Sequence, residues 1–139
     1  MFKYLKNLNN DSHPTEIYTI RASATEEPFG EIKAGSIVSV AYGEIATLYT
    51  PSRPKYLALT SKDYSETAQI KCIRVSSGMV FEADIDPDTE ASSFRIGDLC
   101  DAKEDSTNKG VYITIGGNSN FEIIDNSNIK NGKITVVAI

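Results

Sequence analysis

Tryptophan is absent from this chain of 139 residues, and histidine occurs once. Catalysis by a serine or cysteine nucleophile usually needs a histidine base close by. The single histidine, His13, precedes Pro14 in a segment rich in Asn and Asp. The sequence also lacks a P-loop, a dinucleotide-binding glycine motif and a Gly-x-Ser-x-Gly elbow. We therefore predict no catalytic residues and expect a protein that is not an enzyme.

Cysteine is scarce as well, with only Cys72 and Cys100 in the chain. Neither has a partner at CxxC spacing, which excludes the usual zinc and redox motifs. Both lie in apolar, strand-like runs, so we expect two buried and reduced thiols, although spacing alone does not decide against a disulfide. No metal ligand set and no cofactor is predicted.

Positive charge is sparse and scattered. The formal net charge is -5, and no stretch carries a dense cluster of Lys and Arg. Nucleic acids and anionic membranes both require a basic face, so we expect neither as a partner. No apolar run approaches the ~18 residues of a membrane span, and the first residues lack the apolar core of a signal peptide.

Acidic residues gather where basic ones are missing. Residues 75–94 contain no Lys or Arg, and their acids are Glu82, Asp84, Asp86, Asp88 and Glu90. The spacing of the three aspartates resembles the start of a calcium loop, but an EF-hand then needs Gly at position six and Glu at position twelve. Thr89 and Arg95 stand there instead. We interpret residues 86–89 as a type I turn within a solvated acidic loop. Weak cation binding by residues 82–90 remains an alternative.

Short β-prone runs separated by turn residues dominate the chain from residue 16 onward. The expected strands are 16–21, 31–40, 45–49, 55–59, 69–75, 79–83, 95–100, 110–115, 120–124 and 133–138. No window of eleven or more residues shows a helical period. This pattern predicts an all-β fold, a small β-barrel or β-sandwich with an extended N-terminal arm. We expect the arm at residues 1–15 and a single β domain at residues 16–139.

Glycines punctuate the expected strands. Residues 32–38 and 94–100 share one pattern: an apolar residue, two further residues, Gly, a small polar residue and an apolar run. We predict that Gly35 and Gly97 hold positive φ in tight turns. The pattern occurs in two copies, too short by themselves to establish an internal repeat.

Another turn is expected shortly before the end of the sequence. Asn131 and Gly132 precede a β-branched run, and Asn-Gly between β-prone runs is the strongest short hairpin signal. Both are therefore predicted turn residues.

The N-terminal segment carries the candidate binding residues. It combines apolar and basic side chains in an otherwise acidic chain: Phe2, Lys3, Tyr4, Leu5, Lys6 and Leu8. Breakers are dense from Asn7 to Pro14, which disfavours regular structure there. We interpret residues 1–14 as an anchor that orders on a partner, with a disordered terminus as the alternative.

The order of elements from about Ser23 onward resembles that of small head decoration proteins, or capsid cement proteins, of tailed bacteriophages. The resemblance lies in residues 20–25, 31–38, 54–59, 73–75, 79–83 and 95–99 and in the C-terminal β-branched strand. It implies a structural protein that binds the outer surface of an assembled capsid and stabilises it. The implied partner is the major capsid protein, bound by homotrimers. The implied location is the capsid exterior of the virion, and the host cytoplasm during assembly.

Two other classes compete with this interpretation. A carbohydrate- or ligand-binding β-sandwich module of a virion or surface protein would present exposed aromatic rings to a sugar face. This chain has seven Tyr and no Trp, which favours that class only weakly. An enzyme is disfavoured by the position of the single histidine.

Overall fold

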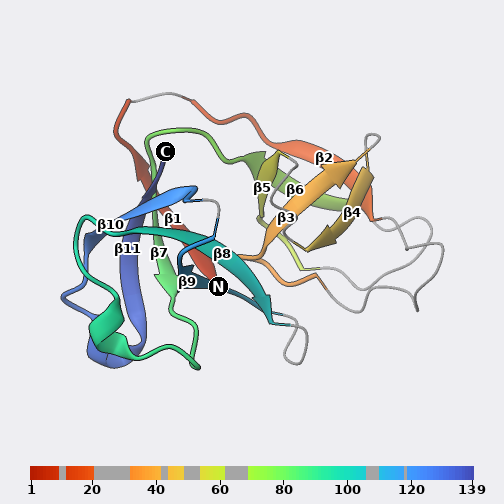
Figure 1. Cartoon of the computed structure of the whole chain (residues 1–139). Helices are drawn as coiled ribbons and strands as arrows, with labels where there is room; N and C mark the ends of the chain where they lie inside the picture. Colours follow the sequence, from red (N-terminus) through yellow and green to blue (C-terminus); the bar gives the residue numbers. More distant parts are fainter. Residues whose placement is uncertain are drawn as a thin grey trace. The chain divides into compact units, whose positions relative to one another are not determined.

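The computed structural model describes residues 1–9, 12–20, 32–41, 44–48, 54–61, 69–105, 110–117 and 119–139 (Figure 1). The strands are β1 (Phe2–Asn7), β2 (Glu16–Ile20), β3 (Ile37–Ala41), β4 (Glu44–Leu48), β5 (Lys55–Ala58), β6 (Gln69–Arg74), β7 (Met79–Asp84), β8 (Leu99–Asp105), β9 (Gly110–Ile115), β10 (Phe121–Asp125) and β11 (Lys133–Ala138). Two short 3-10 segments, η1 (Ala91–Ser93) and η2 (Ile129–Asn131), complete the regular structure of the described residues. The all-β class predicted from the sequence is confirmed.

The chain divides into two compact units. The first comprises Met1–Ser12, Ser76–Lys103 and Val111–Ile139, and the second comprises His13–Val75 and Glu104–Gly110. This division differs from the single β domain expected over residues 16–139. The difference arises because strands that are consecutive in sequence pair in two separate sets.

In the first unit, six strands form one sheet in the order β1-β7-β11-β10-β8-β9. An isolated parallel bridge joins Ile85, just after β7, to Ile113 in β9. The Asp86 N–H also donates to the Ile113 carbonyl at 2.8 Å. These contacts bring β9, at one end of the sheet, next to the residues that directly follow β7.

Alternation along the strands builds the core of the first unit. Met79, Phe81 and Ala83 of β7 are buried, and Ile134, Val136 and Ala138 of β11 are buried beside them. Every second side chain of a strand points to the same face, so these residues form one apolar layer. The rings of Phe81 and Phe121 meet edge to face, with centroids 6.2 Å apart.

In the second unit, the strand order β2-β4-β3-β5-β6 closes on itself, because β6 also pairs with β2. The pairs are antiparallel except that of β2 with β4, which run parallel through Thr19 and Ile20. Ile37, Val38, Ile70 and Cys72 are fully buried in this unit, together with other apolar side chains. The second unit is thus a small closed barrel.

The two units repeat the same arrangement of strands. Taken in chain order, β2 to β6 correspond to β7 to β11: the third strand of each set lies beside the second, the second beside the fourth, and the fourth beside the fifth. The fifth strand pairs with the first in both sets. The parallel contact of β2 with β4 at Ile20 and Ile45 also has a counterpart in the bridge between Ile85 and Ile113.

The two glycine turns show this repeat at the level of single hydrogen bonds. The Gly35 N–H donates to the Ala58 carbonyl at 2.8 Å, and the Gly97 N–H donates to the Ile123 carbonyl at 2.8 Å. A return bond follows each, from the Ala58 N–H to the Ser36 carbonyl and from the Ile123 N–H to the Asp98 carbonyl.

The backbone conformation of the two turns agrees as well. The φ angles are 89° at Gly35 and 90° at Gly97, so the predicted positive φ is confirmed at both. The two-copy sequence pattern therefore marks corresponding turns of a repeated fold.

Each expected strand has a counterpart in the structure, and the bounds predicted for the strands at 110–115 and 133–138 are confirmed, while the other strands have different ends. The strands expected at 31–40 and 95–100 begin later, at Ile37 and Leu99, because residues 33–36 and 95–98 form the glycine turns. The expected ends at Arg21, Glu31 and Tyr49 lie outside the described residues.

The Asn-Gly turn lies where it was predicted, between the antiparallel strands β10 and β11. Gly132 has φ 73° and ends η2, while Asn131 is the last residue of that segment. The connection is longer than a two-residue hairpin loop, because η2 and the residues before it also lie between the two strands.

Candidate binding surface on strand β1

The candidate binding residues from the N-terminal segment lie on and beside strand β1. This corrects the expectation of an arm over residues 1–15, because β1 pairs antiparallel with β7 from Phe2 to Asn7. β1 is the terminal strand of the six-stranded sheet. The described residues 12–15 do lie outside strands, as the breaker-rich composition predicted. The breakers therefore end the strand at Asn7 and do not prevent it.

Two of the six candidates belong to the core of the first unit. The Phe2 side chain is 4% exposed, and its ring lies 6.0 Å from that of Phe81 and 5.6 Å from that of Phe121. The ring of Tyr4, which is half-buried, meets Phe81 edge to face at 6.0 Å. Phe2 is therefore not available to a partner, and Tyr4 is available only in part.

The other four candidates are exposed, and we call them the β1 surface: Lys3, Leu5, Lys6 and Leu8. Leu5 is 45% exposed and Leu8 is 55% exposed. The pairing of β1 with β7 shifts between Tyr4 and Lys6, which places Leu5 at a bulge. Bulges often re-aim a side chain away from the regular face of a sheet.

The backbone beneath the β1 surface is fixed at both ends. The Met1 carbonyl accepts a hydrogen bond from the Asp84 N–H at 3.1 Å, and the Leu8 N–H donates to the Gly78 carbonyl at 2.9 Å. Neither Lys3 nor Lys6 forms an ion pair with another described residue. The β1 surface thus presents two apolar side chains and two ammonium groups from an ordered strand.

The acidic segment that precedes η1 is more structured than a solvated loop. Asp86 is 4% exposed, and its carboxylate accepts hydrogen bonds from the Asp88 N–H at 3.0 Å and from Lys103 Nζ at 3.0 Å. Burial acts to raise the pKa of Asp86, but these bonds outweigh it and hold the pKa below its ordinary value. The predicted turn is confirmed by the bond from the Thr89 N–H to the Asp86 carbonyl at 3.1 Å. The expectation of solvated acids is wrong for Asp86.

Asp84 forms the other ionic cluster of this segment. Its two carboxylate oxygens accept from Lys133 Nζ and from the N-terminal ammonium group, each at 2.7 Å. Burial acts to raise the pKa of Asp84, yet the two cations lower it below its ordinary value. The carboxylates of Asp84 and Asp86 are therefore occupied by basic groups of the same chain. No group of three or more metal-ligating side chains occurs among the residues that the structure describes.

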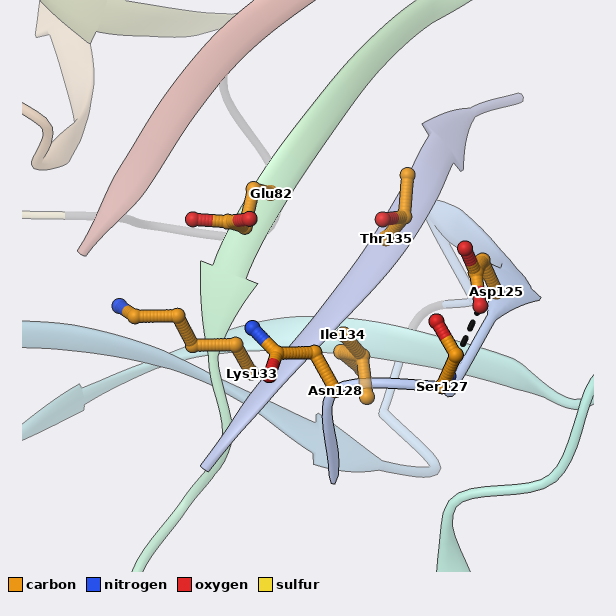
Figure 2. A pocket seen from close by; sticks show the side chains of 7 residues that line it. All are labelled: Glu82, Asp125, Ser127, Asn128, Lys133, Ile134 and Thr135. Carbon is orange, nitrogen blue, oxygen red and sulfur yellow. Dashed lines mark hydrogen bonds between the residues drawn. The ribbon is translucent and has the colours of Figure 1, made fainter. Parts of the chain in front are cut away.

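A polar depression of about 130 Å³ lies on the first unit, beside the ends of β10 and β11 (Figure 2). Its lining residues are Glu82, Asp125, Ser127, Asn128, Lys133, Ile134 and Thr135. Glu82 and Thr135 are direct cross-strand partners, and the Ser127 N–H donates to Asp125 at 2.8 Å. The lining has hydroxyl, amide and charged groups but no aromatic ring on which a sugar could stack.

Both cysteines are free and buried, as predicted. Desolvation by burial raises the pKa of Cys72 and of Cys100 to about 12. Because the thiolate is the reactive form, neither side chain is suited to nucleophilic chemistry near neutral pH. His13, the only histidine, is half-buried.

The second unit holds a polar cluster that was not expected from the sequence. The Tyr18 hydroxyl lies 3.0 Å from a carboxylate oxygen of Glu16 and 3.2 Å from the hydroxyl of Tyr56. The hydrogen bond with Tyr56, then burial, then the bond with Glu16 raise the pKa of Tyr18 above its ordinary value. Between Glu16 and Tyr18, the side chain of Ile17 is 57% exposed.

Comparisons with protein-family models, with curated proteins and with solved structures found no match to this chain. Among the described residues, no helix is long and apolar enough to cross a membrane.

Proposed function

We propose that this protein is a structural binding protein that attaches to the outer surface of an assembled bacteriophage capsid and stabilises it, without catalysing a reaction. The observation that carries the proposal is the β1 surface, where exposed Leu5 and Leu8 alternate with Lys3 and Lys6, whose ammonium groups form no ion pair with another described residue. The resemblance of the element order to capsid decoration proteins supplies the class of partner, the major capsid protein.

In the β1 surface, the leucine side chains can contribute binding affinity, and the lysine side chains can select the orientation of the partner. Fully burying a leucine side chain stabilises by roughly 1.5–3 kcal/mol, and the half-exposed Leu5 and Leu8 can each gain part of that on contact. Lys3 and Lys6 would pair with carboxylates at the rim of the contact, which selects orientation more than it adds affinity. Because the strand is already ordered, little conformational entropy is lost on binding.

Co-sedimentation tests the proposal directly. The purified chain is mixed with undecorated capsids assembled from the major capsid protein of the genome that encodes it. We expect the chain to pellet with the capsids, and the double variant Leu5→Ser/Leu8→Ser to bind at least tenfold more weakly. The matched control is Ile96→Ser/Ile139→Ser, which removes two other exposed apolar side chains of the same unit and should bind like the parent chain.

Two results would refute the proposal. A parent chain that stays in the supernatant at all capsid concentrations removes the capsid as partner. Equal binding by both double variants removes the β1 surface as the contact.

The trimeric state implied by the resemblance belongs to the same proposal. Homotrimers on the capsid would lie at three-fold or quasi-three-fold positions. Cryo-electron microscopy of decorated particles should show density at those positions, and density confined to the centres of capsomers would contradict a trimer.

A carbohydrate-binding module is the second candidate, and the polar depression is the observation that favours it. Hydroxyl, amide and carboxylate groups such as those of Ser127, Asn128 and Asp125 can hydrogen-bond sugar hydroxyls. Binding on a glycan array that is lost in Asp125→Ala and kept in Leu5→Ser/Leu8→Ser would favour this function over capsid attachment.

A further inference from the structure

Comparison of the two repeated units reveals a place that a strand fills in the first unit and that no described strand fills in the second. In the first unit, β1 pairs with β7 along residues 79–83, and β7 is followed by the bridge from Ile85 to β9. In the second unit, β2 meets β4 only through Thr19 and Ile20. No described strand lies on this side of β2 from Glu16 to Tyr18.

Corresponding residues follow from the strand registers. In the second unit, Tyr18 of β2 pairs with Ile70 of β6, and Thr19 pairs with Gln69. In the first unit, the corresponding pairs are Ala83 of β7 with Ile134 of β11, and Asp84 with Lys133. Ile17 therefore corresponds to Glu82, and Glu16 corresponds to Phe81. In the first unit, β1 places Lys3 opposite Glu82.

The backbone of Ile17 points towards the open side. Its partner on β6 is Lys71. The Leu59 N–H donates to the Lys71 carbonyl at 2.8 Å, and the Lys71 N–H donates to Thr60 Oγ1 at 3.2 Å. Both groups of Lys71 thus point away from β2, so Ile17 and Lys71 form a non-hydrogen-bonded pair. The N–H and carbonyl of Ile17 consequently point away from β6.

We propose that the open side of β2 around Ile17 is a docking site for an extended segment of a partner protein, which adds as an antiparallel strand. The segment would occupy the place that β1 occupies in the first unit, and its main chain would bond the N–H and carbonyl of Ile17. This site lies in the second unit and is separate from the β1 surface.

Charge defines the segment that fits. In the first unit, Phe2 and Tyr4 of β1 pack their rings against Phe81, each at 6.0 Å. The corresponding residue in the second unit is Glu16, and none of the ion pairs among the described residues involves its carboxylate. The docked strand therefore needs a Lys or Arg facing Glu16. On the opposite face it needs an apolar residue against Ile17.

The same comparison disfavours a second copy of this chain as donor. The inward side chains of β1 are aromatic and match Phe81, whereas the open site offers a carboxylate. Donation of β1 would also remove the Phe2 ring from the core of its own unit. A partner segment with alternating basic and apolar residues has neither disadvantage.

The probe for the experiment is a short synthetic peptide in which Lys and Val alternate, labelled with a fluorophore and titrated with the full chain. A peptide of equal length with alternating Glu and Val is the control. We expect the Lys peptide to bind at least tenfold more tightly than the Glu peptide. The variant Glu16→Gln should abolish most of this preference.

Two substitutions at one position separate the backbone contact from the side-chain contact. Ile17→Ala removes the apolar side chain but keeps the N–H, and Ile17→Pro removes both. Proline is tolerated on a sheet edge when its nitrogen points away from the neighbouring strand, and the Ile17 N–H points away from β6. We expect Ile17→Pro to bind the Lys peptide at least tenfold more weakly than Ile17→Ala. Equal binding by the two variants would overturn strand addition.

Hydrogen exchange of the parent chain gives a test that does not depend on the folding of a variant. The Ile17 amide should exchange at least tenfold more slowly when the Lys peptide is saturating, and an unchanged rate would overturn the proposal. Failure of the parent chain to bind the Lys peptide would do the same. If the parent chain dimerises and the Ile17→Pro variant does not, the occupant of the site is a second copy of this chain and not a segment of a partner protein.

Discussion

Replacing Phe2 by alanine tests whether β1 belongs to the core or to a detachable arm. The Phe2 ring is 4% exposed and lies within 6.0 Å of two other phenylalanine rings. Its loss removes buried apolar surface and two aromatic contacts and leaves a cavity. An arm outside the core would contribute none of these terms.

The expected cost follows from the position of the ring. Buried Phe→Ala changes cost about 3–5 kcal/mol. β1 is a terminal strand, and its neighbours can partly close around the cavity, so we expect about 3 kcal/mol. Small domains have a total stability of roughly 5–15 kcal/mol. At a urea dependence of about 2 kcal/mol per molar, the unfolding midpoint should fall by roughly 1.5 M.

The two buried cysteines provide a probe for each unit. Cys100 lies in the first unit and Cys72 in the second, so their labelling by a thiol reagent at increasing urea reports on the unfolding of each. Phe2→Ala should lower the urea midpoint for labelling of Cys100, whereas Leu5→Ala, at a half-exposed position of the same strand, should change the free energy of unfolding by less than about 0.5 kcal/mol. A Phe2→Ala midpoint for Cys100 within about 0.5 M urea of the parent chain, which corresponds to about 1 kcal/mol, would show that β1 is not part of the core.

Two further predictions concern stability. A Cβ at Gly117 would lie 2.8 Å from Cβ of the buried Asp101, whereas a Cβ at Gly116 would meet nothing within 4 Å, and both residues have positive φ. Gly116→Ala should therefore destabilise the fold by about 1–2 kcal/mol through backbone strain, and Gly117→Ala by about 1–3 kcal/mol more, as measured by urea unfolding. Equal costs of the two substitutions would contradict the close approach of Gly117 to Asp101. The lowered pKa of Asp86 means that its charge stabilises the fold above the ordinary carboxyl pKa, and that this contribution is lost as the pH falls from that value through the lowered pKa of the folded state. Unfolding midpoints at pH 6 and pH 3 should thus differ less in Asp86→Asn than in the parent chain, and an unchanged pH dependence would contradict the ion pair with Lys103.

Local sequence patterns were sufficient to predict the class of fold and most strands. Alternating β-prone runs bounded by turn residues gave ten expected strands, and glycine after an apolar residue and two further residues marked both positive-φ turns. Strand ends were less predictable, since the backbone of residues 33–36 and 95–98 turns before the apolar run begins. That turn depends on hydrogen bonds to distant residues, Ala58 and Ile123, which no local pattern contains.

The candidate site was harder to predict because its character depends on pairing with a distant strand. The composition of residues 1–8 indicated an apolar and basic segment, but only the register with β7 decides that Phe2 faces the core and Leu5 faces outward. Likewise, the acids at positions 84 and 86 looked solvated because their cationic partners, Lys133 and Lys103, are remote in sequence. Pairing across long sequence separations is the information that a single sequence does not carry.

The two units share their strand arrangement, yet the sequence shows this repeat only as one short pattern around Gly35 and Gly97. A repeated fold needs the same strand pairing and the same turn geometry, and many different side chains are compatible with the same strand pairing. Ile37 corresponds to Leu99 and Val38 to Cys100, and of these pairs only Val38 and Cys100 are both buried, since Ile37 is buried and Leu99 is exposed. Only the turns demand one residue type, because glycine alone holds a φ near 90° without strain. The most informative difference then lies beside Ile17, where the first unit has a partner strand at the corresponding position and no described strand lies in the second.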